Sequence, residues 1–357
     1  MQFDDEELEE VGQDGEQPLY EHYKFIVDRG QQSLRLDKFV HLKLSGTSRN
    51  RIQNACDAGF ILVNGKVSKS SYKVKPQDEV TIVLATPPRA TEVVAENIPI
   101  EIVYEDEYIA VVNKKRGMVV HPGFGNYSGT LVNALAWHFD NLPKTRTKLN
   151  NDQYLERPGL VHRIDKHTSG ILIIAKTEFA MMKLAKDFFD RTMDRRYVAL
   201  CWGDPGQATG TITGNIGRDL KDRKMRTVLP PDNPTGKHAV THYKVLERLG
   251  YLSLVECKLE TGRTHQIRVH FKHIGHPLFA DFEYGGDVVL KGVNTGSYKQ
   301  FVQNCFDLIS GQALHARSLT ITHPITGKKM AFEAPIPEDM QTIIDRFRAY
   351  LSAKTSA

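Results

Sequence analysis

The sequence predicts an α+β protein with a mixed, largely antiparallel sheet and a small separate module at its N-terminus. Segments with the pattern of strands outnumber those with the pattern of helices, and the two kinds do not alternate strictly, as they would around a doubly wound parallel sheet. A chain of 357 residues is also long enough for more than one core. A proline-containing stretch around residue 87 divides a short first part from a longer second part.

The first part, residues 18–86, has the pattern of two short helices and a hairpin. Apolar residues recur at helical spacing over 34–44, and Ser48 stands where the N-cap of a second helix belongs. The pair Asn64-Gly65 predicts a tight turn, after which an apolar run closes the unit as a strand. This arrangement predicts a small module that folds by itself.

Residues 87–96 have the composition of a linker, and residues 97–357 are expected to form one larger domain. Strands are predicted in this domain at 100–103, 109–112, 171–175, 196–202, 239–247, 251–259 and 314–322. Helices are predicted at 129–139, 178–191, 264–274 and 338–352.

The charge of the chain is divided unevenly. The net charge is +4, but residues 1–17 contain eight acidic residues and no lysine or arginine, so residues 18–357 carry +12. The acidic segment has few apolar anchors, which predicts a disordered tail. A basic body suits a polyanion such as RNA, because neutralising phosphates and releasing counterions dominates nucleic-acid affinity. Mildly basic soluble proteins with solubilising tails are also common, so charge alone leaves the partner open.

Membrane and redox functions find no support in the sequence. No apolar run approaches the roughly 18 residues of a membrane helix, and the first residues are acidic, unlike a signal peptide. The four cysteines are far apart and form no Cys-x-x-Cys pair, so we interpret them as buried or inert thiols. A cytoplasmic protein is therefore expected.

The segment HRIDKHTSG, residues 162–170, gathers polar side chains directly before the apolar run ILIIA. A loop that enters a buried strand is a place where a rigid scaffold holds functional groups beside solvent. Asp165 is then a candidate nucleophile or base, and Arg163 a candidate phosphate or base contact. The hydroxyls of Thr168 and Ser169 would fix the loop. Taken locally, the same residues also suit a capped surface turn.

The segment TGRTHQIRVHFKHIGHPLFAD, residues 261–281, predicts a helix with Ile267, Phe271 and Ile274 on one face and Arg268 on another. Four histidines in this segment suggest a metal site. Their spacing does not match that of a zinc-binding helix, and no carboxylate or thiolate lies among them. No metal is expected here.

The segment RTMDRRYVALCWG, residues 191–203, places Tyr197 in a strand beside two arginines. Packing is the usual role of a strand tyrosine, but an aromatic ring flanked by cations can also stack on an unpaired base. Basic residues gather again on the loop 218–239 and at the start of the second helix of the first module, where cations oppose the helix dipole. The candidates for RNA binding at these two places are Arg49, Arg51, Arg223, Lys224 and Arg226.

Three of these segments, in this order, resemble the signature blocks of the RluA-type RNA pseudouridine synthases: VHRIDKHTSGILIIAK, RRYVAL and ETGRTHQIRVHFKHIGHPLFAD. The closing segment HARSLTITHPITGKKMAFEAPIP fits the same family, and the first module resembles the S-four, or alpha-L, RNA-binding domain. The resemblance runs from about residue 33 to about residue 348. It implies a pseudouridine synthase catalytic fold, α+β, around a bent mixed sheet.

The resemblance implies an isomerase that converts specific uridines of large-subunit ribosomal RNA to pseudouridine without a cofactor. Asp165 would be the catalytic carboxylate, acting on the ribose, on the ring or as a base. Arg268 would be its ion-pair partner, and Tyr197 the active-site tyrosine that stacks on the uracil. Arg163 would fill the gap left when the target nucleotide flips out of its helix, because the ring cannot rotate inside a stack.

The implied partner is ribosomal RNA in the assembling large subunit, bound by a monomer that has no membrane contact. Two stretches, 141–159 and 288–311, differ from the family's usual loops, so the exact RNA target stays open. One alternative is a noncatalytic RNA-binding ribosome-assembly factor. Another is a ribonuclease that uses His162 or His265 as acid and base.

Overall fold

We describe a computed structural model of the chain over residues 19–44, 47–84, 93–123, 126, 128–148, 154–219 and 225–355. The chain forms two compact units, Met1–Glu92 with Arg146–Glu156, and Val93–Thr145 with Arg157–Ala357. The domain bounds expected from the sequence, with a linker at 87–96, stay predictions. The predicted acidic tail, 1–17, lies outside the described residues.

The first unit is a small antiparallel sheet with two helices. Its sheet has the order β1-β4-β2-β3, and both helices pack against it, α1 through Leu36, Phe39 and Val40 and α2 through Ile52, Ala55 and Cys56. Both predicted helices are present, and Ser48 caps the second by accepting a hydrogen bond from the backbone N–H of Arg51. The bounds are β1 Tyr20–Ile26, α1 Leu36–Lys43, α2 Arg49–Asp57, β2 Ile61–Val63, β3 Lys66–Val67 and β4 Glu79–Leu84.

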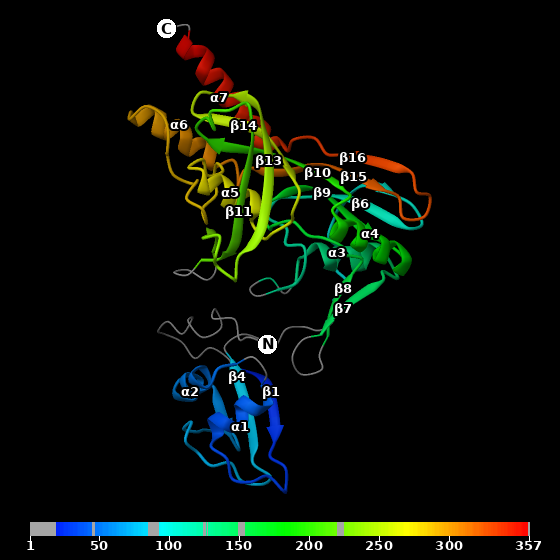
Figure 1. Cartoon of the computed structure of the whole chain (residues 1–357), viewed down its shortest axis with the longest axis vertical. Coiled ribbons are helices and arrows are strands. Elements are labelled where there is room, and N and C mark those ends of the chain that lie inside the picture. The colour runs from blue at the N-terminus through cyan, green and yellow to red at the C-terminus, as the bar shows by residue number, and fades with distance from the viewer. Residues whose placement is uncertain are drawn as a thin grey trace. The chain divides into compact units, whose positions relative to one another are not determined.

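The second unit is built on a sheet that has ten strands within the described ranges. Its order is β12-β11-β13-β14-β10-β15-β9-β6-β5, with β16 paired to β15 (Figure 1). The bounds are β5 Glu101–Glu105, β6 Ile109–Lys114, β9 Ser169–Ala175, β10 Asp194–Trp202, β11 Thr209–Arg218, β12 Arg226–Leu229, β13 Lys237–Arg248, β14 Leu252–Leu259, β15 Leu314–Thr322 and β16 Lys329–Glu333. A separate hairpin comprises β7 Lys144–Lys148 and β8 Tyr154–Pro158.

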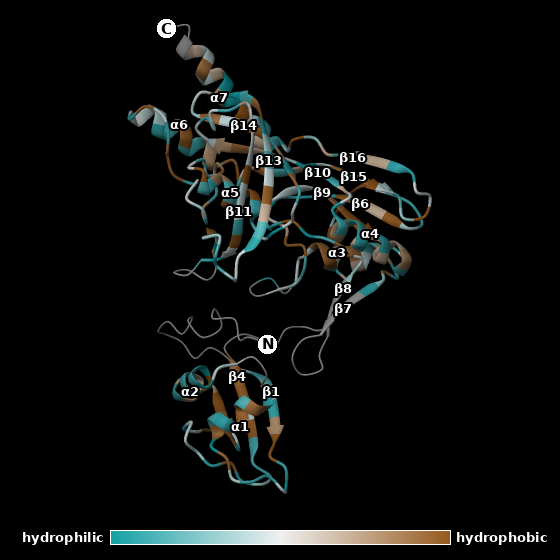
Figure 2. Cartoon of the chain, viewed as in Figure 1, coloured by the Kyte–Doolittle hydropathy of each residue, from teal (hydrophilic) through white to brown (hydrophobic). Residues whose placement is uncertain are grey.

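Helices cover both faces of the second unit's sheet. Along β6 and β9, alternate side chains point to opposite faces, so α4 packs against Val111 and Ile173 while α3 packs against Val112 and Ile174. Figure 2 shows hydrophobic and hydrophilic residues mixed along these helices, as expected where one side of a helix is buried. The bounds are α3 Leu131–His138, α4 Glu178–Asp190, α5 Gln266–His273, α6 Gly296–Phe306 and α7 Glu338–Thr355.

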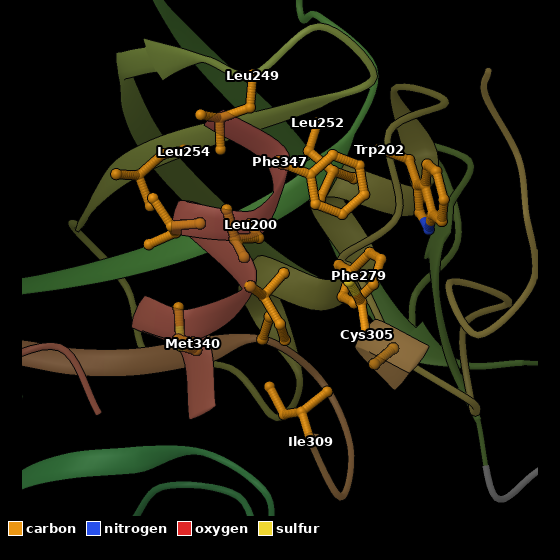
Figure 3. Close-up of a cluster of buried hydrophobic side chains, with 14 of the residues drawn as sticks. Leu200, Trp202, Leu249, Leu252, Leu254, Phe279, Cys305, Ile309, Met340 and Phe347 are labelled. Carbon is orange, nitrogen blue, oxygen red and sulfur yellow. The ribbon is translucent and has the colours of Figure 1, made fainter. Parts of the chain in front are cut away.

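An aromatic and aliphatic core joins β10 and β14 to the last two helices (Figure 3). Phe279 lies at its centre, with ring centroids 5.4 Å from Trp202, 4.7 Å from Phe306 and 6.1 Å from Phe347. Because Phe347 comes from α7, this cluster anchors the C-terminal helix to the central strands. The scaffold behind the middle of the sheet is therefore tightly packed.

Each strand and helix predicted from the sequence is present, with ends displaced by a few residues. The α+β class with a largely antiparallel sheet is confirmed, since β9 and β15 form the one parallel pair among the described strands. No strand or helix was predicted at β1, the β7–β8 hairpin, β11, β12, α6 or β16. No helix in the described part of the chain is long and apolar enough to cross a membrane.

The parallel contact between β9 and β15 requires a glycine. Gly170 has a φ of +112°, and a Cβ atom placed there would lie 2.2 Å from the carbonyl oxygen of Ala316.

We predict that Gly170→Ala lowers the free energy of unfolding by about 2–5 kcal/mol, because it adds backbone strain to overpacking. Urea denaturation measures this. Gly275→Ala, at φ +81° with open space around it, should cost clearly less, and equal losses would contradict the steric explanation.

Candidate active site

A cavity of about 820 Å³ opens on the second unit, and its walls come from three segments singled out in the sequence. The loop before β9 contributes Asp165, β10 contributes Tyr197, and the start of α5 contributes Arg268. The volume falls in the range of about 300–1,000 Å³ that is typical of small-molecule sites. The structure thus brings the three predicted catalytic residues to one place.

Two buried cations, both distant in sequence from Asp165, hold the loop that carries it. Lys114 is 2% exposed, and its Nζ donates to the carbonyl oxygen of Lys166 at 3.0 Å and to two nearer carbonyls. Burial lowers the pKa of Lys114 to about 7. Arg116 donates to the carbonyl of His167 and pairs with Asp339 of α7 at 2.7 Å. The sequence analysis missed both residues.

The loop hydroxyls behave as the sequence suggested. Thr168 donates its backbone N–H to the carbonyl of Asp165 at 3.1 Å, which closes a turn around the carboxylate. The Thr168 hydroxyl accepts a hydrogen bond from Gln312 at 3.2 Å, and the Ser169 hydroxyl pairs with His315 at 3.0 Å. These contacts tie the loop to the residues around the start of β15.

The carboxylate of Asp165 is partly exposed and faces two donors at a distance. The Nη1 atom of Arg268 lies 3.6 Å from Oδ2, and the Nε2 atom of His265 lies 3.9 Å from Oδ1. Its side chain is 24% exposed and accepts no direct hydrogen bond within the described ranges. The group is therefore near positive charge yet free to contact a molecule in the cavity.

Arg268 is fixed by two other carboxylates. Its Nε and Nη2 atoms donate to the two oxygens of Asp281 at 2.7 Å each, and Nη2 also contacts Glu283. The guanidinium lies 4.8 Å from the ring centre of Tyr284. Burial alone would lower the pKa of Arg268, but its hydrogen bonds to Asp281 and the nearby carboxylates raise it above its ordinary value. Arg268 thus remains a permanent cation that presents Nη1 to Asp165.

Tyr197 lines the cavity as a protonated phenol. Burial raises the pKa of its hydroxyl, and the negative charge of Asp165 raises it further, against an opposing effect of Arg195. The hydroxyl makes no hydrogen bond with the described residues, and the partly buried ring packs against the edges of two apolar clusters. The ring and its donor are therefore available to a bound molecule.

The mouth of the cavity combines arginines with an exposed aromatic ring. Arg163 is exposed and makes no ion pair within the described part of the chain. Arg191, Arg195 and Phe189 also line the cavity, and Phe189 is 84% exposed. A phenylalanine left this open beside cations suits an unpaired base and its phosphate. The sequence analysis missed Phe189, although its position beside the RRYVAL block was a possible signal.

The other predicted RNA-binding residues are less clearly placed. Arg49 is 44% exposed on its side chain and pairs with the buried Asp37 at 2.8 Å, so it also stabilises the first unit. Arg51 lies in the first turn of the same helix, and Arg226 begins β12 without lining the cavity. Arg223 and Lys224 lie outside the described residues.

The histidines divide into two kinds. His162 accepts a hydrogen bond from the backbone N–H of Ile173 at 3.0 Å and stacks on Phe188, and burial lowers its pKa to about 3. It is therefore unsuited to the acid–base role of a ribonuclease. His265, which the sequence suggested only as an acid or base of a ribonuclease, instead lies in the cavity. No group of metal-binding side chains occurs among the residues that the structure describes.

Comparison with known proteins identifies two domains. Residues 108–273 match the family model "RNA pseudouridylate synthase", and residues 34–80 match the "S4 domain" model. An uncharacterized RNA pseudouridine synthase of Chlorobaculum parvum is 43% identical over 92% of this chain and 99% of its own length. A protein of Zymomonas mobilis named ribosomal large subunit pseudouridine synthase D is 40% identical over 87% of this chain and 92% of its own length.

A solved structure supports the fold. The human RNA pseudouridylate synthase domain containing 4 protein superposes with a TM-score of 0.53 at 23% identity, covering 70% of this chain and 93% of that one. The resemblance drawn from the three sequence blocks is thus confirmed by comparisons that extend over most of the chain. The chain belongs to the RNA pseudouridine synthase family and is an isomerase that converts uridine to pseudouridine in RNA.

Proposed function

We propose that this enzyme isomerises specific uridines of large-subunit ribosomal RNA, with Asp165 as the reacting group. The observation that carries this proposal is the convergence of Asp165, Tyr197 and Arg268 on one cavity of suitable size. The relatives named ribosomal large subunit pseudouridine synthase D, from three bacteria, are 36–40% identical to this chain and support the choice of RNA.

The reaction breaks the bond between ribose and ring nitrogen, rotates the uracil, and joins carbon five to the ribose; carbon five gives up its proton, and the freed ring nitrogen takes one up. Attack on the ribose, attack on the ring and removal of a proton all require an ionised Asp165. The guanidinium of Arg268, a permanent cation, lies 3.6 Å from the Asp165 carboxylate. Since Asp281 and Glu283 share that cation, Asp165 is held less tightly than in a direct salt bridge and keeps its reactivity.

The uracil has to leave its helix before it can rotate. Tyr197 offers a ring face for the flipped base inside the cavity, and Phe189 offers another at the mouth. Arg163, exposed at the edge, is placed to enter the gap that the nucleotide leaves. The protonated phenol of Tyr197 can also donate a hydrogen bond to the ring.

The first unit is proposed to hold RNA by charge. Lys66, Lys69 and Lys73 are exposed on its surface, and the domain matches the S4 model. Contacts between lysine side chains and phosphates raise the affinity for RNA but do not distinguish one uridine from another. Selection of the target would then rest on the cavity and its mouth. The predicted monomeric state and the assembling subunit as substrate remain predictions.

The proposed function is tested in cells that lack this protein. Carbodiimide-based mapping of ribosomal RNA should show pseudouridines missing from the large-subunit RNA. The unmodified gene should restore them, whereas Asp165→Asn should restore less than about one part in a thousand, because the amide cannot act as an anionic nucleophile or base. Restoration by Asp165→Asn would refute the catalytic assignment, and loss confined to other RNAs would refute the substrate.

The role of the first unit is tested by salt dependence. Replacing Lys66, Lys69 and Lys73 together with glutamine should reduce the slope of log Kd against log salt by about 2, since each phosphate contact contributes about 0.7–0.9. Fluorescence anisotropy with a ribosomal RNA fragment gives this slope. The control triple of Lys299, Lys328 and Lys329, all exposed on the second unit, should leave it unchanged. An equal effect of both triples would contradict the assignment.

A further inference from the structure

His265 occupies a strained position between Asp165 and Tyr284. It directly precedes α5 with φ 56° and ψ 22°, a left-handed conformation that side-chain-bearing residues seldom adopt. Its side chain does not cap the helix. Strain of this kind persists where the surroundings enforce it, which is most often at functional sites. Capping of the helix therefore does not explain why a histidine occupies this position.

The hydrogen bonds of Tyr284 determine which nitrogen of His265 carries the proton. The Tyr284 hydroxyl accepts a hydrogen bond from the backbone N–H of Arg226 at 3.2 Å and lies 2.8 Å from His265 Nδ1. Burial raises the pKa of Tyr284, so its hydroxyl keeps its hydrogen and needs an acceptor. Nδ1 is the acceptor within reach among the described residues. The imidazole proton is consequently on Nε2.

The imidazole is neutral in this arrangement. Burial lowers the pKa of His265, and the charge of Arg268 lowers it further, while the carboxylates of Asp165, Glu283 and Asp281 oppose them. A neutral His265 with its proton on Nε2 directs that N–H toward the cavity, where Oδ1 of Asp165 lies 3.9 Å away. Arg268 faces the other oxygen, Oδ2, at 3.6 Å. Each carboxylate oxygen of Asp165 thus has one donor of its own.

We propose that His265, oriented by Tyr284, is a positioning residue that donates its Nε2–H to Asp165 and sets the direction of the reacting carboxylate. This inference rests on the proposed role of Asp165. The 3.9 Å separation is longer than a hydrogen bond, and such contacts commonly shorten when substrate fills the site. A neutral donor fixes the orientation of the carboxylate without adding a second full charge that would weaken it as a nucleophile or base.

The test uses the full-length protein and three variants. His265→Leu removes the donor, His265→Gln keeps an amide N–H of similar reach, and Tyr284→Phe removes the hydroxyl but leaves the ring beneath Arg268. The measurements are kcat and KM for pseudouridine formation on a ribosomal RNA fragment, with circular dichroism and thermal unfolding to compare the folded state.

His265→Leu should lower kcat about 10–100-fold and leave KM within about twofold, because the lost contact acts on the reacting group and not on RNA binding. His265→Gln should recover at least about a third of kcat, since its N–H replaces the donor. Tyr284→Phe should lower kcat on its own but have no further effect in the His265→Leu background, because Tyr284 acts through His265.

Three results would overturn the proposal: a kcat for His265→Leu within twofold of the unmodified protein, no advantage of His265→Gln over His265→Leu, or additive losses in the double variant. If His265→Leu does not fold, the remaining two variants decide, and full activity of Tyr284→Phe would contradict the role. Asp165→Asn in the same assay separates the two claims. An active Asp165→Asn refutes the proposed function, whereas an inactive Asp165→Asn beside a fully active His265→Leu refutes only the role of His265.

Discussion

The buried ion pair between Arg268 and Asp281 is the interaction on which the site depends. Its two hydrogen bonds are 2.7 Å long, and the Asp281 side chain is fully buried. Because the pair is bidentate, it fixes the plane of the guanidinium and leaves Nη1 facing Asp165. Removing one partner of such a pair costs about 3–5 kcal/mol, since a charge is left buried without compensation. The pair thus stabilises the fold and also fixes the position of the cation that faces Asp165.

The second constraint is the sheet itself, which brings the reacting loop to this cation. The parallel contact of Gly170 with Ala316 places the start of β9 beside β15, and β15 in turn lies next to the strand that carries Tyr197. Lys114 and Arg116 then hold the loop that carries Asp165 by donating hydrogen bonds to its backbone carbonyls. A rigidly held loop with a partly exposed carboxylate suits a reaction in which the uracil of the substrate has to rotate while the enzyme stays fixed.

Much of the fold and of the candidate active site could be predicted from the sequence, because strong periodicity and long signature blocks are local signals. The pattern of apolar residues gave the main strands, and the three blocks indicated Asp165, Tyr197 and Arg268. Other features depend on distant contacts: the anchoring of Arg268 by Asp281 and the burial of Lys114 appear only in the folded chain. β11 was missed because glycines weaken a strand pattern, and α6 because it lies in a stretch interpreted as a variable loop.

The most direct test of the central claim is a crystal structure of the Asp165→Asn variant bound to an RNA stem-loop that contains a mapped target uridine. The account predicts that this uridine lies outside its helix, inside the cavity, with its ring against Tyr197 and its ribose or ring next to residue 165. Arg163 should fill the gap in the stack. A bound RNA whose target uridine remains stacked, with the cavity empty, would contradict the account.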